Sequence, residues 1–417
     1  MSSLMNFGRV NGISKIGDLL RQYMFPWLAF YAAEGTPSDK VLFITVASLV
    51  QALPSLTLGN YSARVVRRFS PRATSLWSNA GMGIVVLLTA IAVYNGLHNK
   101  AVVLTAWLLV GTLEVLYYPS RDCLYAALAG SNDRERAAAN SAAAFTYQVG
   151  RAFISLVMLG VVCLIGPVPD EVPRAILAAA LCVDAFSFGV VVLFLCLLHE
   201  VPKLREEPTE SSNRISVLQA ASVRGAVPVF LCVLMLWAFA YSSFYFVFEF
   251  YQELEADTQL RQASFYLAMF ASACGGFFGA KIWKLNLPAL GLGMLTVCFV
   301  EATVAFMPRD WFWGTAWICV ISFLSILVYT SVFDGMIPQL VQGLDKNAEV
   351  SSTINMVKEG LSPVIVVGIA ALANYCNAPR EILVGACALS AFVVLTTLVV
   401  RKSAIEDVIK ASISEKV

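Results

Sequence analysis

One stretch of the sequence decides the class of fold: residues 174–198, RAILAAALCVDAFSFGVVVLFLCLL. It holds two charged residues, Arg174 at its start and Asp184 near its middle, and is otherwise almost entirely apolar. About 20 helical residues cross the roughly 30 Å hydrocarbon core of a bilayer. A run of this length and composition therefore predicts a transmembrane helix.

The whole chain has the composition of a membrane protein. Of its 417 residues, 58% are hydrophobic and 14% are charged, and the mean hydropathy is +0.72. A typical soluble domain is about 25% charged. The 29 Lys and Arg and 28 Asp and Glu are too few to cover a soluble protein of this length. The composition thus argues against a soluble enzyme, a secreted disulfide scaffold and a disordered chain, and the net charge of +1 against a nucleic-acid binder.

Eleven further apolar runs, bounded by charged residues, Pro or Gly, are long enough to cross the membrane. The twelve predicted spans are residues 11–33, 41–65, 73–95, 101–128, 138–166, 174–198, 226–252, 262–284, 287–307, 311–341, 351–374 and 380–401. A polar segment with two prolines, residues 199–225, separates the first six spans from the last six. We therefore predict an all-α membrane protein of two pseudo-symmetric six-helix bundles, residues 1–198 and 226–417, joined by a cytoplasmic linker at 199–225 and followed by a short cytoplasmic tail.

Basic residues predict the orientation, because Lys and Arg are enriched in cytoplasmic loops. With the N-terminus inside, nineteen of the 29 Lys and Arg residues lie on the inner side and six on the outer side. Both termini are therefore expected in the cytoplasm.

The two halves share a sequence pattern, which predicts a parallel duplication. A glycine, a small residue and two basic residues follow the second span and recur after the eighth at an offset of 217: Gly59, Ala63, Arg64 and Arg67 correspond to Gly276, Ala280, Lys281 and Lys284. A second match follows the fourth and tenth spans at an offset of 212: Asp122, Leu128, Asp133 and Arg134 correspond to Asp334, Leu340, Asp345 and Lys346.

Twelve spans, a long central loop and a basic, glycine-led segment after the second span resemble the major facilitator superfamily along nearly the whole chain. The family pattern in this segment is kept at Gly59, Arg64, Arg67 and Arg68, but Ala63 replaces its aspartate and Val66 its second glycine. The stretches S-x-x-G-D (Ser14, Gly17, Asp18) and A-N-S (Ala139, Asn140, Ser141) resemble the branch of enterobactin-type siderophore exporters and multidrug efflux proteins. The resemblance implies secondary transport by alternating access, with spans 1, 4, 7 and 10 around a central cavity.

Charged residues inside the predicted spans are the strongest functional signal. An ionisable group at mid-bilayer costs on the order of 3 kcal/mol and usually faces a bundle interior or a wet cavity. Counted from the loop between their spans, Glu114 and Arg151 reach a similar depth, and we predict that they pair. The pair is either a fixed strut or a working site where proton and substrate compete. Asp184 has no basic neighbour at helical spacing and is expected to be unpaired, as a proton-sensitive group or as a neutral acid in helix packing.

The seventh span carries an aromatic cluster, WAFAYSSFYFVFEFYQE at residues 237–253. On a cavity wall, such a cluster suits a bulky amphipathic solute; the alternative is an aromatic belt at the membrane interface. The candidate proton-coupling or substrate residues are Glu114, Arg151, Asp184, Glu249, Tyr241, Tyr245 and Lys358.

A further group is expected to gate the cytoplasmic side by forming and breaking salt links between the halves. Its members are Asp18, Arg21, Gly59, Arg64, Arg67, Arg68, Asp122 and Asp334. The alternative for any one of them is a solvated helix end.

The sequence contains no Walker-type phosphate loop and no plausible catalytic triad, and its two histidines, His98 and His199, lie in predicted loops. We therefore expect no enzyme activity, no cofactor and no metal site, and the ten cysteines are interpreted as reduced thiols. The favoured function is export of a small amphipathic organic compound by proton antiport, in a monomer in the bacterial inner membrane. The alternatives are a ferroportin-like metal exporter, which a stretch containing Phe333, Asp334, Gln339 and Gln342 vaguely resembles, and a non-transporting scaffold or receptor.

Overall fold

A computed structural model describes residues 3–33, 37–129, 133–166, 174–198, 254–279, 287–331, 356–376 and 378–400. These residues are nearly all helical, with one isolated bridge between Glu255 and Asp310. The all-α prediction is therefore confirmed. Eleven of the twelve predicted spans overlap a described helix, and the span at 226–252 lies outside the described residues.

The described residues form two compact units. Unit 1 contains α1 (Ser3–Ala32), α2 (Pro37–Phe69), α3 (Pro71–Tyr94), α4 (Lys100–Ala129), the first part of α5 (Asp133–Ile165) up to Tyr147, α6 (Arg174–Leu197) and residues 356–360. Unit 2 contains α5 from Gln148 onward, α9 (Thr258–Gly279), α10 (Leu287–Ala302) with the short η1 (Thr303–Phe306), α11 (Trp311–Thr330), α14 (Ser362–Cys376) and α15 (Pro379–Val400). A π-helical turn, η3 (Val357–Leu361), precedes α14. The linker predicted at 199–225 lies outside the described residues, so the boundary between the bundles stays a prediction.

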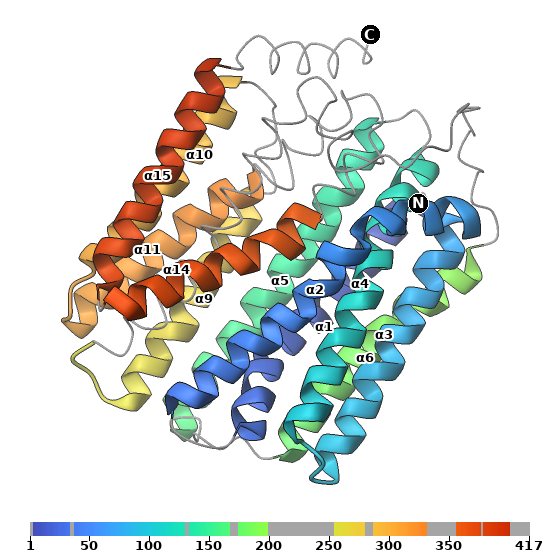
Figure 1. The fold of residues 1–417 in the computed structure, drawn as a ribbon, viewed down its shortest axis with the longest axis horizontal. Coiled ribbons are helices and arrows are strands. Elements are labelled where there is room, and N and C mark those ends of the chain that lie inside the picture. The colour runs from blue at the N-terminus through green and yellow to red at the C-terminus, as the bar shows by residue number, and fades with distance from the viewer. Residues whose placement is uncertain are drawn as a thin grey trace. The chain divides into compact units, whose positions relative to one another are not determined.

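In unit 1, α1 packs against α6 and α4, α2 against α4, and α3 against α4 and α6 (Figure 1). Two apolar clusters hold these helices together. The larger one includes Phe25, Leu28, Trp107 and Leu181. The smaller one joins the start of α1 to the ends of α4 and α6 and includes Phe7. Unit 1 therefore has an apolar layer on each side of the middle of α1.

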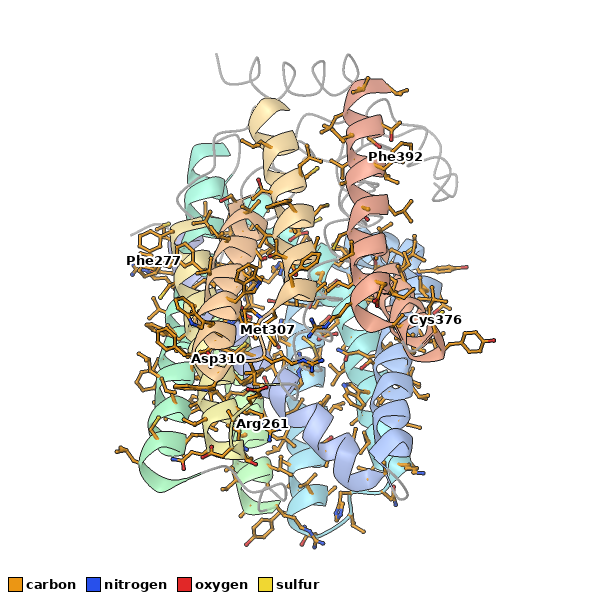
Figure 2. All side chains as sticks on the ribbon, turned by 90° about the vertical axis from the view of Figure 1, so that its left-hand side faces the viewer. Arg261, Phe277, Met307, Asp310, Cys376 and Phe392 are labelled. Atoms are coloured by element: carbon orange, nitrogen blue, oxygen red, sulfur yellow. The ribbon has the colours of Figure 1, made fainter. Side chains whose placement is uncertain are left out.

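In unit 2, α9 packs on α11, and α15 packs on α10 and α14 (Figure 1). The core includes Val304, Ile318 and Leu383. Figure 2 shows Met307 and Asp310 close together beside the start of α11, where the Asp310 carboxylate caps the helix by accepting a hydrogen bond of 3.0 Å from the backbone N–H of Trp313. Such a cap satisfies a donor that the first turn of a helix leaves free.

Six of the described helical segments are long and apolar enough to cross a membrane: residues 71–94, 100–125, 142–164, 174–197, 311–330 and 380–400. Two other helices differ in length from their predicted spans. Helix α1 begins at Ser3 rather than at residue 11, and α2 continues through the basic segment to Phe69. It ends there because Ser70 has a φ of 69° and Pro71 starts the next helix. The basic segment is therefore helical and not a loop.

Candidate functional site

The centre of unit 1 holds one arginine surrounded by three carboxylates. Arg21 on α1 lies 2.7 Å from Asp18 of the same helix and 2.9 Å from Glu114 of α4. Its Nε lies 3.4 Å from Oδ2 of Asp184 on α6. We call these four residues the Arg21 cluster. When all four groups are ionised, it carries two more negative than positive charges.

The cluster is largely shielded from solvent. The side chain of Asp184 is fully buried and that of Arg21 is 6% exposed, while Glu114 and Asp18 retain 14% and 22% exposure. The Arg21 guanidinium also lies 5.6 Å from the ring centre of Phe188, and such contacts favour a cation. The cluster is therefore closed at Asp184 and partly open at Glu114 and Asp18.

Hydrogen bonding in the cluster is incomplete. Gln51 on α2 donates to Oε2 of Glu114 over 3.0 Å, so that α2 also supports the site. Within the described part of the chain, neither carboxylate oxygen of Asp184 nor Nη1 of Arg21 has a hydrogen-bond partner. Buried polar groups without partners are rare and commonly mark a functional site. The Asp184 end of the cluster is therefore the part best able to form a new hydrogen bond or ion pair.

The cluster lies near the middle of its helices. Asp18 is the sixteenth of the 30 residues of α1, Glu114 the fifteenth of the 30 of α4, and Asp184 the eleventh of the 24 of α6. At about 1.5 Å per residue, Glu114 is roughly 20 Å from either end of its helix. The apolar clusters of unit 1 lie along the helices on both sides. The charges are thus placed at mid-span between apolar layers.

Two glycines allow the helices to approach at this level. A Cβ at Gly17 would overlap the Ser187 hydroxyl and come within 2.7 Å of Oδ1 of Asp184. A Cβ at Gly111 would overlap the backbone carbonyl of Gln51. The missing side chains therefore let α1 meet α6 at Asp184, and α4 meet α2 at Gln51.

We predict that Gly17→Ala destabilises the protein by about 1–3 kcal/mol, the usual cost of overpacking a well-packed core. The matched control is Gly189→Ala on α6, because a Cβ there meets nothing within 4 Å and Ala is a better helix former than Gly by roughly 0.5–1 kcal/mol. Melting curves in detergent should show a lower transition temperature for the Gly17 variant alone. Equal transitions in the two variants would contradict the close approach.

A second polar network joins α1 to α4 beside the cluster. The Tyr117 hydroxyl donates to Oδ1 of Asn11 over 2.5 Å, and Nδ2 of Asn11 donates to the Tyr125 hydroxyl over 3.1 Å. Arg121 forms an ion pair with Asp122 at 2.9 Å and lies 5.2 Å from the ring centre of Tyr118. The Asn11 contacts tie the polar first half of α1 to α4, whereas the Arg121 contacts lie within α4.

The structure corrects one sequence-based expectation and adds to another. Asp184 was expected to be unpaired, but Arg21 reaches it from another helix. The spacing along a single helix does not show which neighbouring helix supplies the partner. Within unit 1, Glu114 contacts Arg21 and Gln51. Its predicted pairing with Arg151, a residue of unit 2, stays a prediction.

Asp18 and Arg21 lie at a different depth in their helix than the sequence predicted. They were assigned to the inner end of the first span, as gate residues. Because α1 begins at Ser3, they lie at mid-helix and share one cluster with Glu114 and Asp184. Their gate role, predicted from that shorter span, stays a prediction.

The remaining proton-coupling or substrate candidates are not part of this cluster. Arg151 belongs to unit 2, where its Nη2 lies 3.6 Å from Sδ of Met269 on α9. Lys358 lies in the π-helical turn η3. Tyr241, Tyr245 and Glu249 lie outside the described residues.

Among the other gate candidates, Gly59 is buried against the side chain of Met356, and Asp122 pairs with Arg121. Arg68 is exposed at the end of α2. Arg64 and Arg67 lie on the same helix, and Asp334 is outside the described residues. The gate role of these residues stays a prediction.

Some site residues were not predicted from the sequence. Gln51 and Phe188 were missed because neither an amide nor a phenyl ring in a span stands out. Gly17 was identified only as part of the S-x-x-G-D stretch. Each named residue of that stretch has a structural role in unit 1: Ser14 is buried, Gly17 makes room for Asp184, and Asp18 binds Arg21.

Membrane-length helices around an ion-pair cluster at mid-span define a polytopic helical membrane protein. A family model described as Major Facilitator Superfamily matches residues 18–367. The chain therefore belongs to the major facilitator superfamily of membrane transporters. No curated protein matches it.

Two solved structures have a similar fold. One is a variant of the Escherichia coli fucose:proton symporter FucP, with a TM-score of 0.66 and 14% identity over 96% of this chain and 99% of that one. The other, described as the transporter FucP in the outward conformation, has a TM-score of 0.64 and 14% identity over 95% of this chain and 97% of that one. At this identity the likeness establishes the fold alone.

Proposed function

We propose that this transporter exports a small amphipathic organic compound, siderophore- or drug-like, in exchange for protons, and that the Arg21 cluster is its proton-coupling site. The observation that carries the proposal is the excess of carboxylates around one guanidinium at mid-span. Ionisable groups are costly at this depth and in membrane proteins usually serve ion or substrate movement. A purely structural role would need only one carboxylate for one arginine.

The shared arginine supplies the coupling. A proton on Glu114 removes the charge that holds Arg21 at 2.9 Å. The guanidinium can then turn toward Asp184, whose oxygens have no hydrogen-bond partner in the described structure. Such an exchange of ion pairs gives two discrete arrangements, as a transport switch requires. Protonation would thereby bias the alternation between the two faces of the membrane.

The partial exposure of Glu114 and Asp18 gives protons access to the cluster, while Asp184 stays closed. We further propose that the protein is a monomer in the bacterial inner membrane, with both termini in the cytoplasm, as the distribution of Lys and Arg predicts. A divalent metal cargo is less compatible with the site, because a guanidinium already occupies its centre.

The proposal predicts export driven by a pH gradient. Purified protein in vesicles with an acidic lumen should accumulate an added amphipathic compound, drawn from a panel of ethidium, a rhodamine dye and a catecholate siderophore. A pH dye in the lumen should report loss of protons at the same time, and nigericin, which collapses the gradient, should abolish both signals.

The control is the same set of vesicles without protein. Accumulation that survives collapse of the pH gradient would contradict proton coupling. Movement of the compound out of the lumen together with protons would contradict antiport and indicate symport.

A further inference from the structure

Unit 2 contains a polar seam between α5 and α9, which lie side by side in Figure 1. Three contacts define it. A Cβ at Gly276 would overlap the Gln148 amide, Arg151 touches Sδ of Met269 at 3.6 Å, and Gln259 donates to the carbonyl oxygen of Val162 over 2.9 Å. As the residue numbers on α5 increase from 148 to 162, the numbers of their partners on α9 decrease from 276 to 259. The two helices are therefore antiparallel.

This register brings three polar side chains to one level. Gln148 and Arg151 are three residues apart and therefore share a face of α5. On α9, Ser272 lies three residues after Met269 and four before Gly276, which are the positions opposite Arg151 and Gln148. Ser272 therefore lies beside the stretch of seam between Gln148 and Arg151.

The seam holds polar atoms without partners. Gln148 is 4% exposed and Ser272 is 3% exposed. In the described structure, Oε1 of Gln148, Oγ of Ser272 and Nε of Arg151 are all buried without a hydrogen-bond partner. Leaving such a group unsatisfied costs about 1–3 kcal/mol, and more when it is charged. Among the described residues, the hydrogen-bond partner of the Arg151 guanidinium is the thioether sulfur of Met269, a weak acceptor.

We infer that Gln148, Arg151 and Ser272 form an anion subsite that receives a carboxylate of the transported solute. A carboxylate presents two oxygens in one plane, which match the donors of a guanidinium. Ser272 can donate a further hydrogen bond, and Oε1 of Gln148 can accept one from a hydroxyl beside the carboxylate. The subsite selects a hydroxylated organic acid.

This inference rests on the proposed function, since it names the substrate class of the same transporter, but it uses residues outside the Arg21 cluster. The shared chemistry is an anionic oxygen, which a lipid phosphate also offers. We assign the subsite to the solute, because Gln148 and Ser272 are almost fully buried and a headgroup phosphate stays at the membrane surface.

Salicylate, which carries a carboxylate beside a hydroxyl, is the probe, and salicylamide is its neutral counterpart. Calorimetric titration of the purified protein in detergent should detect binding of salicylate and at least about tenfold weaker binding of salicylamide. Arg151→Gln should weaken salicylate binding by a similar factor, and Arg151→Lys by less because it keeps the charge. Ser272→Ala should weaken it severalfold.

The matched control is Arg261→Gln on α9, because it removes a guanidinium of the same helix that donates to the backbone carbonyl of Ala256, and binding should be unchanged. Salicylate binding that is equal in wild type and Arg151→Gln would overturn the subsite. A second result would also overturn the subsite: salicylate does not bind, but phosphatidylglycerol in nanodiscs raises the melting temperature of the wild type and not that of Arg151→Gln.

A separate arm distinguishes this inference from the proposed function. Salicylate binding needs no pH gradient, so it should persist in Asp184→Asn. In the wild-type protein, salicylate binding without any pH-driven export would remove the proposed coupling and leave the subsite, whereas pH-driven export of ethidium without salicylate binding would remove the subsite.

Discussion

Arg21→Met is expected to destabilise the protein by about 3–5 kcal/mol, the cost of leaving buried charges without their partner. Arg21 is the shared ion-pair partner of Asp18, Glu114 and Asp184, two of them from other helices. Its removal leaves three carboxylates together at mid-span. The measurement is the apparent melting temperature in detergent, where the variant should unfold well below wild type.

Neutralising the carboxylates should restore much of this loss. The triple variant Arg21→Met, Asp18→Asn, Glu114→Gln should melt near wild type, because it removes two of the three carboxylate charges that the loss of Arg21 leaves without their partner. Arg68→Met is the control, since Arg68 is exposed at the end of α2 and surface charges contribute about 0–1 kcal/mol. If Arg21→Met melted like Arg68→Met, the cluster would not hold unit 1 together.

Asp184→Asn and Glu114→Gln are expected to abolish transport driven by a pH gradient while the protein stays folded. Each change keeps the shape of the side chain but removes its ability to exchange a proton. Asn has nearly the same shape as Asp. Because neither carboxylate oxygen of Asp184 accepts a hydrogen bond in the described structure, Asp184→Asn breaks no hydrogen bond and removes only the ionic contact with Arg21. Flux of the compound identified in vesicles should fall to the level of empty vesicles under a pH gradient.

Exchange of the same compound across vesicles without a pH gradient should continue in both variants, because it requires no net proton movement. Glu381→Gln is the control: this carboxylate is exposed in the first turn of α15 and should not affect either measurement. Full pH-driven flux in Asp184→Asn and Glu114→Gln would remove these residues from proton coupling.

Much of the fold was predictable because a bilayer imposes a simple length and polarity rule on each span. The run at 174–198 and its counterparts are recognisable one by one, without knowledge of their neighbours. The same rule marked Glu114 and Asp184 as functional candidates, since charged residues in a span are costly. Both belong to the Arg21 cluster.

The pairing inside the cluster was not predictable by the same means. Depth counting ignores which face of a helix a residue occupies, and it did not predict that Arg21 contacts Glu114 and Asp184. The start of α1 was placed eight residues too late, because Asn6, Arg9 and Asn11 are polar. Asn11 is polar and buried because Tyr117 and Tyr125 satisfy its amide from another helix. Such tertiary compensation leaves no pattern in a single sequence.

The central claim is that the Arg21 cluster exchanges protons, and infrared difference spectroscopy between acidic and alkaline samples tests it most directly without a known substrate. The carbonyl stretch of a protonated carboxyl group is distinct from the bands of a carboxylate. We predict a pH-dependent protonated-carboxyl band in wild type and in Glu381→Gln that is reduced in both Asp184→Asn and Glu114→Gln. The same band, unchanged in all four proteins, would contradict it.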